Sequence, residues 1–215
     1  MTREDRVPLA ALTLGVLAFS LLAALVKADT THAFDHRVLS WLHVPGEPVA
    51  PVFSAWLVDP MTDITALGGY TALTLLTLGA ALYYALLGRY VMSVAVILAI
   101  ASSGLVTHLL KLGIDRMRPD LVDHLTHSAN ASFPSGHALQ ATAAFLIIGA
   151  LAAQAQQNPR IKSLILASAA LLIFLVGVSR VYLGVHWPTD VLAGWCLGTA
   201  WAGLWWLVLR RVSGR

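Results

Sequence analysis

Charged residues are scarce in this chain of 215 residues: they make up 12% of it, while hydrophobic residues make up 58%. An ordinary soluble domain has about 25% charged and about 45 to 50% apolar residues. The scarcity indicates that water is not the main solvent of this protein. Basic residues exceed acidic ones by only 3, and the chain has no run of five or more like charges. Nucleic acid is therefore not an expected partner.

Cysteine is almost absent, since Cys196 is the only one, so the chain cannot form an intramolecular disulfide. Cys196 lies within an apolar run, where a packing role is expected. The sequence also lacks internal repeats, low-complexity tracts and any linker long enough to separate domains. A single domain over residues 1–215 is the expectation.

Six long apolar runs are what the chain does have. Each approaches the roughly 20 residues that a helix needs to cross a bilayer. None alternates with the period of two typical of barrel strands, and a backbone in lipid must satisfy its own hydrogen bonds. The sequence therefore predicts an all-α bundle of six transmembrane helices over residues 7–26, 64–88, 90–110, 138–154, 163–179 and 191–209.

A short amphipathic segment follows the first predicted span. Phe34, Val38, Trp41 and Leu42 fall on one face of a helix, which is the pattern of an interfacial helix lying in the membrane surface. Residues 50–58 are also apolar, but they are too few to span a bilayer and include Pro51. Their sequence assigns them no definite role.

Lysine and arginine counts predict the orientation, because these residues are retained preferentially in the cytoplasm. Six spans place both termini on one side. With cytoplasmic termini, the inner side holds eight bases and two acids, and the outer side six bases and nine acids. The first span follows Arg3 and Arg6 and could be a signal peptide, but its apolar run is long for one. We expect a retained span in a bacterial cytoplasmic membrane.

The polar residues in and beside the predicted spans gather in three segments. Because the spans alternate in direction, the end of the third, the start of the fourth and the end of the fifth share the outer face. The topology therefore predicts that these segments build one extracytoplasmic site. In chain order, their notable residues are Lys111, Arg118 and Pro119; Pro134, Ser135, Gly136 and His137; and Ser179, Arg180, His186 and Asp190.

The cations among these residues predict a pocket for an oxyanion. Lys111, Arg118 and Arg180 are permanent charges, and guanidinium groups match phosphate oxygens in a bidentate manner. Ser135 and Gly136 open a predicted helix, whose free N–H groups and positive dipole end also favour an anion. Taken separately, the Pro-Ser-Gly-His segment is equally typical of a helix cap, and residues 111–119 of a solvated loop.

The two histidines suit two different steps of phosphoryl chemistry. His186 can attack phosphorus as a neutral imidazole, while Asp190, four residues later, holds the other ring nitrogen. His137 is then available to protonate a leaving alkoxide and later to activate water. The His186–Asp190 pair by itself fits a metal site or a structural pair equally well.

These segments resemble the three signature blocks of the type 2 phosphatidic acid phosphatase superfamily. The matching residues are Lys111 with Arg118 and Pro119, the tetrapeptide from Pro134 to His137, and Ser179 and Arg180 with His186 and Asp190. All eleven motif positions agree in order and spacing, which a single short motif could not make significant. The blocks cover residues 111–190, and the six-span layout extends the resemblance to nearly the whole chain.

The resemblance implies a phosphatase without metal or other cofactor that forms a phosphohistidine, with His186 as nucleophile, Asp190 as its partner and His137 as acid. It also implies phosphate contacts from five residues: Lys111, Arg118, Ser135, Gly136 and Arg180. The family includes soluble haloperoxidases, which the hydropathy of this chain disfavours. The implied substrate is a membrane lipid phosphate, such as phosphatidylglycerol phosphate, phosphatidic acid, undecaprenyl diphosphate or lipid A phosphate. A phosphotransferase and a non-catalytic lipid-binding or transport protein are the alternatives.

Other polar residues near the predicted site carry weaker hypotheses. His108 lies one turn before Lys111 and either reaches the pocket or lies outside it. Asp123, His124 and His127 have the composition of a metal site, but a solvated loop is the simpler expectation. Tryptophans near the ends of the last span are expected to be interfacial anchors. These are Trp187, Trp205 and Trp206.

Overall fold

The computed structural model describes residues 5–42, 55–119 and 131–212, and these residues form helices without any strand. The helices are α1 (Arg6–Lys27), α2 (His32–Leu42), the 3-10 helix η2 (Ala55–Leu57), α3 (Val58–Ala66), α4 (Tyr70–Leu86), α5 (Tyr90–Gly113), α6 (Gly136–Gln154), α7 (Pro159–Tyr182) and α8 (Pro188–Val212). The predicted all-α fold is therefore confirmed. Residues 50–54, part of the short apolar segment discussed above, lie outside the described residues.

Five single helices are long and apolar enough to cross a membrane, namely α1, α5, α6, α7 and α8. The helices α3 and α4 together pass the same test but meet at a bend of 41°. The second predicted span, residues 64–88, is thus a helix pair broken between Ala66 and Tyr70. The break contains Gly68, whose added Cβ would lie only 2.5 Å from Cγ1 of Val176 on α7. The chain therefore bends at a glycine, because a side chain at this position would prevent the close approach to α7.

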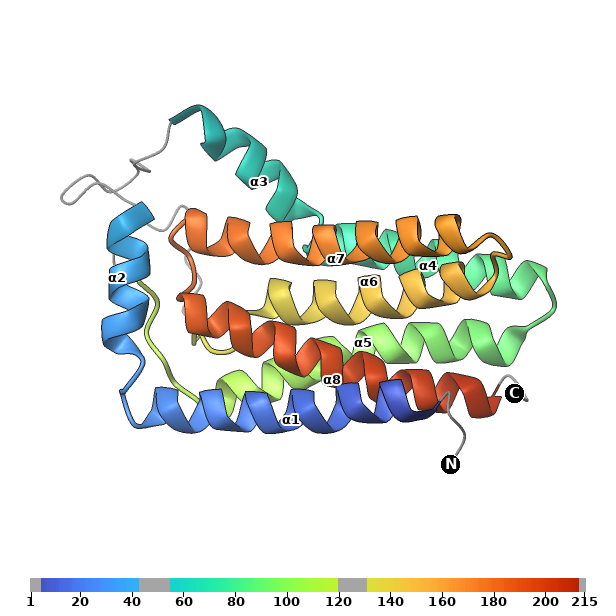
Figure 1. Cartoon of the computed structure of the whole chain (residues 1–215), viewed down its shortest axis with the longest axis horizontal. Coiled ribbons are helices and arrows are strands. Elements are labelled where there is room, and N and C mark those ends of the chain that lie inside the picture. Colours follow the sequence, from blue (N-terminus) through green and yellow to red (C-terminus); the bar gives the residue numbers. More distant parts are fainter. Residues whose placement is uncertain (1–4, 43–54, 120–130, 213–215) are drawn as a thin grey trace.

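The long helices lie side by side, and α6 is the central one (Figure 1). Within its apolar stretch, 61% of the residues are buried, against 6% in α1. The helix α6 packs against both α7 and α8, and α1 packs along the other side of α8. The helix α2 crosses one end of the bundle, whereas both chain termini lie at the opposite end (Figure 1).

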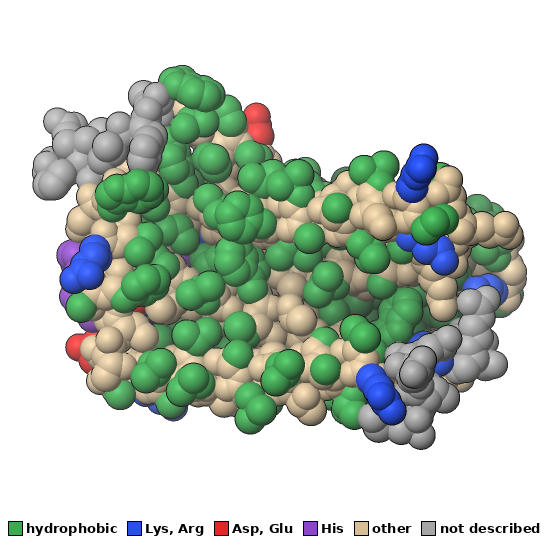
Figure 2. Space-filling view, in the orientation of Figure 1, with side chains coloured by type: hydrophobic (Ala, Val, Ile, Leu, Met, Phe, Trp, Pro, Cys, Tyr) green, Lys and Arg blue, Asp and Glu red, His purple; other side chains and the backbone are tan. Residues whose placement is uncertain are grey.

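The surface of the bundle matches a membrane environment. Hydrophobic side chains cover the visible flank, and lysine and arginine side chains gather toward the two ends (Figure 2). On α2, Phe34 and Trp41 are 52% and 66% exposed, as expected for the lipid-facing side of an interfacial helix. The side of α2 that carries Asp35 and Leu39 is fully buried against the bundle.

Glycines permit the close packing of α6 and α8. A Cβ added to Gly198 would lie 2.6 Å from both the carbonyl oxygen of Leu139 and Cβ of Thr142. A Cβ added to Gly194 would lie 2.9 Å from the carbonyl oxygen of Ser135. Small residues four apart are typical of helix pairs in membranes, because they let the two backbones approach. This seam holds the first turn of α6 against the first turns of α8.

We expect Gly198→Ala to destabilise the protein by about 1 to 3 kcal/mol, since the added methyl group overpacks the seam. Unfolding in a single detergent, followed by circular dichroism, measures the effect. Gly79→Ala is the matched control, because no described atom lies within 4 Å of its added Cβ. That control should be neutral or stabilising by up to about 1 kcal/mol, the helix-propensity gain of alanine over glycine. Equal stability of the two variants would contradict close packing at Gly198.

Candidate active site

Four helix ends meet at the end of the bundle where α2 lies: the C-terminal ends of α5 and α7 and the N-terminal ends of α6 and α8 (Figure 1). The three sequence segments are joined there by backbone contacts. The N–H of Ser135 donates to the carbonyl oxygen of Asp190 at 3.0 Å, and the N–H of Ser132 donates to that of Arg116 at 2.8 Å. The predicted convergence of the polar segments is therefore present in the fold.

His186 and Asp190 form a buried pair at the start of α8. Nδ1 of His186 lies 3.3 Å from Oδ2 of Asp190, and the two side chains are 2% and 0% exposed. The backbone N–H of Trp187 donates to the same carboxylate oxygen at 3.1 Å. Because the carboxylate only accepts hydrogen bonds, it holds the histidine proton on Nδ1 and leaves Nε2 with its lone pair.

The predicted cations surround this pair. Lys111, Arg118 and Arg180 lie close enough to interact electrostatically with His137, and Arg118 also interacts with Asp190. The guanidinium of Arg118 donates to the carbonyl oxygen of Val185 at 3.0 Å. Together the three cations concentrate positive charge where four helix ends meet, which is an environment that binds anions.

Two buried polar atoms of this cluster have no hydrogen-bond partner within the described part of the chain: Oγ of Ser135 and Nε of Arg180. Arg180 is otherwise held by a hydrogen bond of 2.9 Å from Nη1 to Oγ1 of Thr65 on α3. A buried donor without a partner costs about 1 to 3 kcal/mol. Both atoms can donate to an oxyanion, which would remove that cost.

His137 lies in the first turn of α6, beside the glycine break between α3 and α4. A Cβ added to Gly68 would lie 3.5 Å from Cβ of His137, and one added to Gly69 would lie 3.8 Å from Nε2 of His137. The bent span therefore forms one wall of the site. Gly68, Gly69 and Thr65 were not predicted from the sequence to belong to the site, although consecutive glycines inside an apolar run signal a bend or a close approach.

Burial lowers the pKa of His186 from its ordinary value of 6.5 to about 4, even though the hydrogen bond and the charge of Asp190 act to raise it. The charges of Arg180 and Arg118 lower it further. Burial likewise lowers the pKa of Arg118, opposed by the charge of Asp190. His186 is consequently a neutral imidazole at pH 7.

The structure describes most of the residues that carried weaker sequence hypotheses. His108 is exposed, unlike the partly buried Lys111 one turn later. Asp123, His124 and His127 lie outside the described residues. Trp187 is only 8% exposed, and its indole N–H donates to the carbonyl oxygen of Met117 at 2.9 Å. The expectation that Trp187 is an interfacial anchor is therefore wrong; it packs beneath the site. Trp205 and Trp206 pack against the hydrophobic core.

Two charged residues close to the site were assigned no role from the sequence. Arg116 donates to Oδ1 of Asp190 at 2.6 Å, and Asp35 of α2 accepts from Arg116 at 2.6 Å. In the sequence, Arg116 is one of several polar residues in a loop, and Asp35 lies on the predicted interfacial helix, off its apolar face. The signal available was that Asp35 shares a helical face with Leu39, so both could be buried together.

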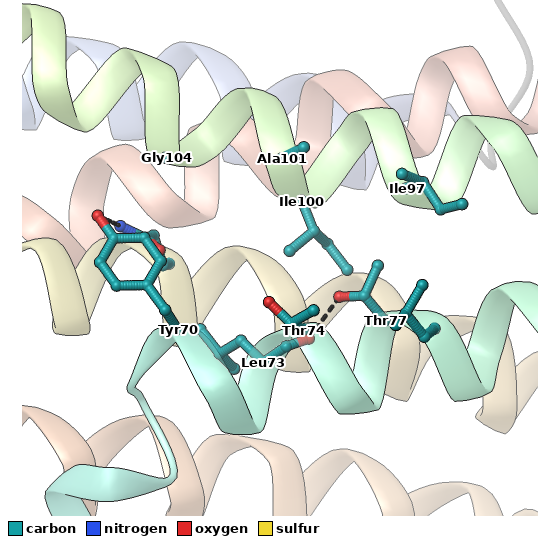
Figure 3. A pocket seen from close by; sticks show the side chains of 10 residues that line it. Tyr70, Leu73, Thr74, Thr77, Ile97, Ile100, Ala101 and Gly104 are labelled. Atoms are coloured by element: carbon teal, nitrogen blue, oxygen red, sulfur yellow. Dashed lines mark hydrogen bonds between the residues drawn. The ribbon is translucent and has the colours of Figure 1, made fainter.

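An apolar groove opens beside the site between α4 and α5 (Figure 3). It has a volume of about 270 Å³. Ile97, Ile100 and Gly104 line it from α5. Tyr70 at the start of α4 and Gln140 of α6 also line it. Gln140 is one helical turn beyond Gly136, and its amide donates to the Tyr70 hydroxyl at 3.4 Å.

The fold and the site define an α-helical, multi-pass membrane protein with a cation-rich polar site at one end of the bundle. Comparison with known families identifies the group: the PAP2 superfamily profile matches residues 92–213. The chain belongs to this superfamily, which confirms the resemblance seen in the three motifs.

The relatives of the chain include lipid phosphatases. Phosphatidylglycerophosphatase B of Bacillus subtilis is 31% identical over 185 residues, covering 85% of this chain and 86% of that protein. Lipid A 1-phosphatase of Rhizobium johnstonii is 36% identical over 163 residues, or 70% and 60% of the two chains. The crystal structure of the transmembrane PAP2-type phosphatidylglycerolphosphate phosphatase of Bacillus subtilis aligns with a TM-score of 0.80 at 28% identity, covering 95% of this chain and 96% of that one. This chain is a membrane phosphatase of the same family.

Proposed function

We propose that the protein hydrolyses the phosphomonoester or diphosphate of a membrane lipid headgroup, and that His186 carries the phosphoryl group as a covalent intermediate. One observation carries the proposal: a buried, neutral histidine is held by a carboxylate among three cations. In the same cluster, Oγ of Ser135 and Nε of Arg180 have no hydrogen-bond partner among the described residues. The histidine supplies the nucleophilic nitrogen, and the cations and donors bind the phosphoryl oxygens.

In the first step, the Nε2 lone pair of His186 attacks phosphorus while the bond from phosphorus to the leaving oxygen breaks. Asp190 stabilises the imidazolium that develops, because its carboxylate accepts a hydrogen bond from Nδ1–H. His137 acts as the general acid and gives a proton to the leaving alkoxide. The lipid alcohol, or the shortened lipid phosphate, is the first product.

In the second step, water attacks the phosphohistidine. His137, now neutral, removes a proton from the water as the oxygen–phosphorus bond forms. The phosphorus–nitrogen bond breaks, and its electron pair returns to Nε2 of His186. Inorganic phosphate leaves, and the enzyme regains its starting state.

The remaining residues bind and stabilise the phosphoryl oxygens. Lys111, Arg118 and Arg180 neutralise the negative charge, while Ser135 donates from Oγ and the first N–H groups of α6, beginning at Gly136, point to the same anion. Because these cations supply the charge stabilisation that a divalent metal would otherwise give, we propose chemistry that requires no metal.

The proposal also includes the architecture and orientation of the protein. A single domain covers the chain, the site faces away from the cytoplasm, and both termini are cytoplasmic.

The apolar groove supports a lipid substrate over a soluble phosphate ester. It begins about 10 Å from Lys111, because seven residues of α5 separate Lys111 from Gly104 and each adds about 1.5 Å. A lipid whose phosphate lay among the cations would find an apolar surface for one chain at that distance. Candidate substrates are phosphatidylglycerol phosphate, phosphatidic acid, undecaprenyl diphosphate and lipid A phosphate, in a bacterial cytoplasmic membrane.

Phosphate release by purified protein in detergent with excess chelator tests this function. The substrates are the four lipid phosphates and a water-soluble phosphate ester of the same headgroup chemistry. Release from at least one lipid, and much less from the soluble ester, is the expected result. Transfer of the phosphoryl group to an added alcohol, without inorganic phosphate, would identify a phosphotransferase. Activity that depends on added metal would overturn metal independence.

Filling the groove tests how the lipid binds. We expect Ala101→Phe to raise KM for the lipid substrate about tenfold, the cost of losing roughly 1.4 kcal/mol of apolar contact. KM for the soluble ester should not change, because Ala101 lines only the groove. Leu105→Phe is the control: Leu105 is 58% exposed on α5 and does not line the groove. Equal KM values for the lipid in both variants would contradict chain binding in this groove.

The lowered pKa of His186 predicts a specific acid limb in the pH profile. Only the neutral imidazole can attack, so kcat/KM must fall as the pH drops through the pKa of the free enzyme. With a pKa of about 4 in place of 6.5, the His186-dependent limb should lie below about pH 5. The profile is corrected for the second ionisation of the substrate phosphate. A limb at the ordinary histidine value would show that His186 is not desolvated.

A further inference from the structure

Asp35 is a buried carboxylate on α2, a helix that otherwise lies across the outside of the bundle. The residue is 0% exposed. Its Oδ2 accepts hydrogen bonds from Nη2 of Arg116 and from Oγ1 of Thr189, both at 2.6 Å. Its Oδ1 accepts the backbone N–H of Thr189 at 2.9 Å. A buried charge persists only when it is paired and hydrogen-bonded, as Asp35 is.

Arg116 connects this carboxylate to the proposed active site. One guanidinium nitrogen, Nη2, donates to Asp35, while Nη1 donates to Oδ1 of Asp190 at 2.6 Å and to Oγ1 of Thr189 at 2.8 Å. The guanidinium also lies 5.5 Å from the centre of the Trp187 ring, within the range of a cation–π contact. One planar cation thus bridges two buried carboxylates.

The bridge fixes the orientation of Asp190. Its Oδ1 binds Arg116, so its Oδ2 is directed to Nδ1 of His186 and to the N–H of Trp187. Asp35 anchors the other side of Arg116 and accepts an N–H in the first turn of α8, the helix that carries Asp190. The four side chains form a continuous series: Asp35, Arg116, Asp190 and His186.

Asp35 also has an electrostatic effect on His186. A guanidinium in direct contact with Asp190 reduces the negative potential that Asp190 produces at His186. Asp35 lies on the other side of the guanidinium and offsets its positive charge, at a low dielectric that strengthens the interaction. Without Asp35, the positive charge of Arg116 would be offset by Asp190 alone. Asp190 would then stabilise less well the His186 imidazolium that forms during attack.

We propose that Asp35 and Arg116 are positioning residues of the phosphatase site, acting on His186 through Asp190. The interfacial helix α2 is thereby a part of the catalytic apparatus as well as a membrane contact. Neither side chain needs to touch the substrate. The inference rests on the proposed function, because it assumes that His186 is the nucleophile.

Asp35→Asn tests the proposal, since the amide keeps the shape of the carboxylate and removes its charge. We expect kcat to fall about 10- to 100-fold, by analogy with the loss of outer-shell partners of metal-bound histidines. KM for the lipid and the inhibition constant of inorganic phosphate should change less than about threefold, since the phosphate-binding cations remain in place. A structural collapse would instead weaken phosphate binding as well.

A double-mutant cycle with Asp190→Asn adds a readout of the coupling. Asp35→Asn should have little further effect on kcat when Asp190 is already asparagine, because the path to His186 is interrupted. Additive losses would overturn the proposal. Asp63→Asn is the matched control, because Asp63 is an exposed carboxylate on α3, and it should behave as the parent.

Arg116→Lys is the second variant, used if Asp35→Asn fails to fold. An ammonium group keeps the charge but cannot present the planar fork that bridges two carboxylates, so the same loss of kcat is expected. Unchanged kcat in a folded Asp35→Asn or Arg116→Lys protein would refute the inference. If His186→Ala retained activity, the proposed function itself would fail, and this result is independent of both variants.

Discussion

Replacing His186 with alanine is expected to lower kcat for phosphate release by at least about 100-fold, the lower range for loss of a catalytic group. The expectation follows from the geometry at Nε2. Asp190 occupies Nδ1 of the ring, and burial keeps the ring neutral, so Nε2 is the available nucleophile. Alanine removes the atom that would bond to phosphorus, and no other described histidine is paired with a carboxylate in this cluster.

The assay for His186→Ala compares phosphate release by parent and variant in excess chelator. His108→Ala serves as the control, because His108 is exposed on α5, one turn before Lys111, and it should retain parental kcat. Unfolding curves establish that both variants are folded. Equal phosphate release by His186→Ala and the parent would contradict the assignment of His186 as the nucleophile.

The second large effect is expected for His137→Ala, and it should depend on the leaving group. A phosphomonoester releases a basic alkoxide that needs a proton, so kcat should fall about 10²- to 10⁴-fold. When a lipid diphosphate is attacked at its terminal phosphorus, the leaving group is the lipid monophosphate, which is a weak base and does not need a proton. P–O cleavage of the diphosphate should be much less affected, and hydrolysis of the phosphoenzyme should become the slow step.

The measurement for His137→Ala is a pair of pre-steady-state time courses. With a lipid diphosphate, a rapid burst of lipid monophosphate should precede slow release of inorganic phosphate. With a phosphomonoester, both products should appear slowly and together. Identical time courses for the two substrates would contradict the role of His137 as the proton donor.

The membrane fold could be predicted because it depends on local properties of the sequence. Runs of about 20 apolar residues specify spans, and alternating span directions then place three polar segments on one face. The convergence of the Lys111, His137 and His186 segments needed no further information. The broken second span was missed, because hydropathy averages over Gly68 and Gly69, whose effect comes from contact with Val176 and His137 on other helices.

The connection between Asp35 and the site could not be predicted from the sequence in the same way. The two partners Asp35 and Arg116 are 81 residues apart, and neither is one of the eleven motif positions. On the predicted apolar face of α2, Phe34 and Trp41 are exposed, whereas Val38 and Leu42 pack against buried residues of the bundle. The amphipathic pattern could not indicate that the opposite face meets the first turn of α8, because that contact depends on tertiary packing.

The groove also became visible only in the structure. Its lining residues on α4 and α5 have the composition of any lipid-facing helix surface, so hydropathy does not distinguish Ile97 or Ile100 from their neighbours. The polar end of the groove depends on Tyr70 and Gln140, which are 70 residues apart. The groove for a lipid chain is formed by helix packing and could not be predicted from the sequence, whereas the phosphate site could be predicted from the motifs.

Trapping the phosphoenzyme tests the central claim most directly. His137→Ala protein is mixed with a lipid diphosphate carrying a labelled terminal phosphate, quenched with base to preserve phosphohistidine, and digested for mass spectrometry. We predict a phosphoryl group on His186, and none when His186 is also replaced by alanine. A label on another residue, or persistence of the label in the double variant, would contradict nucleophilic attack by His186.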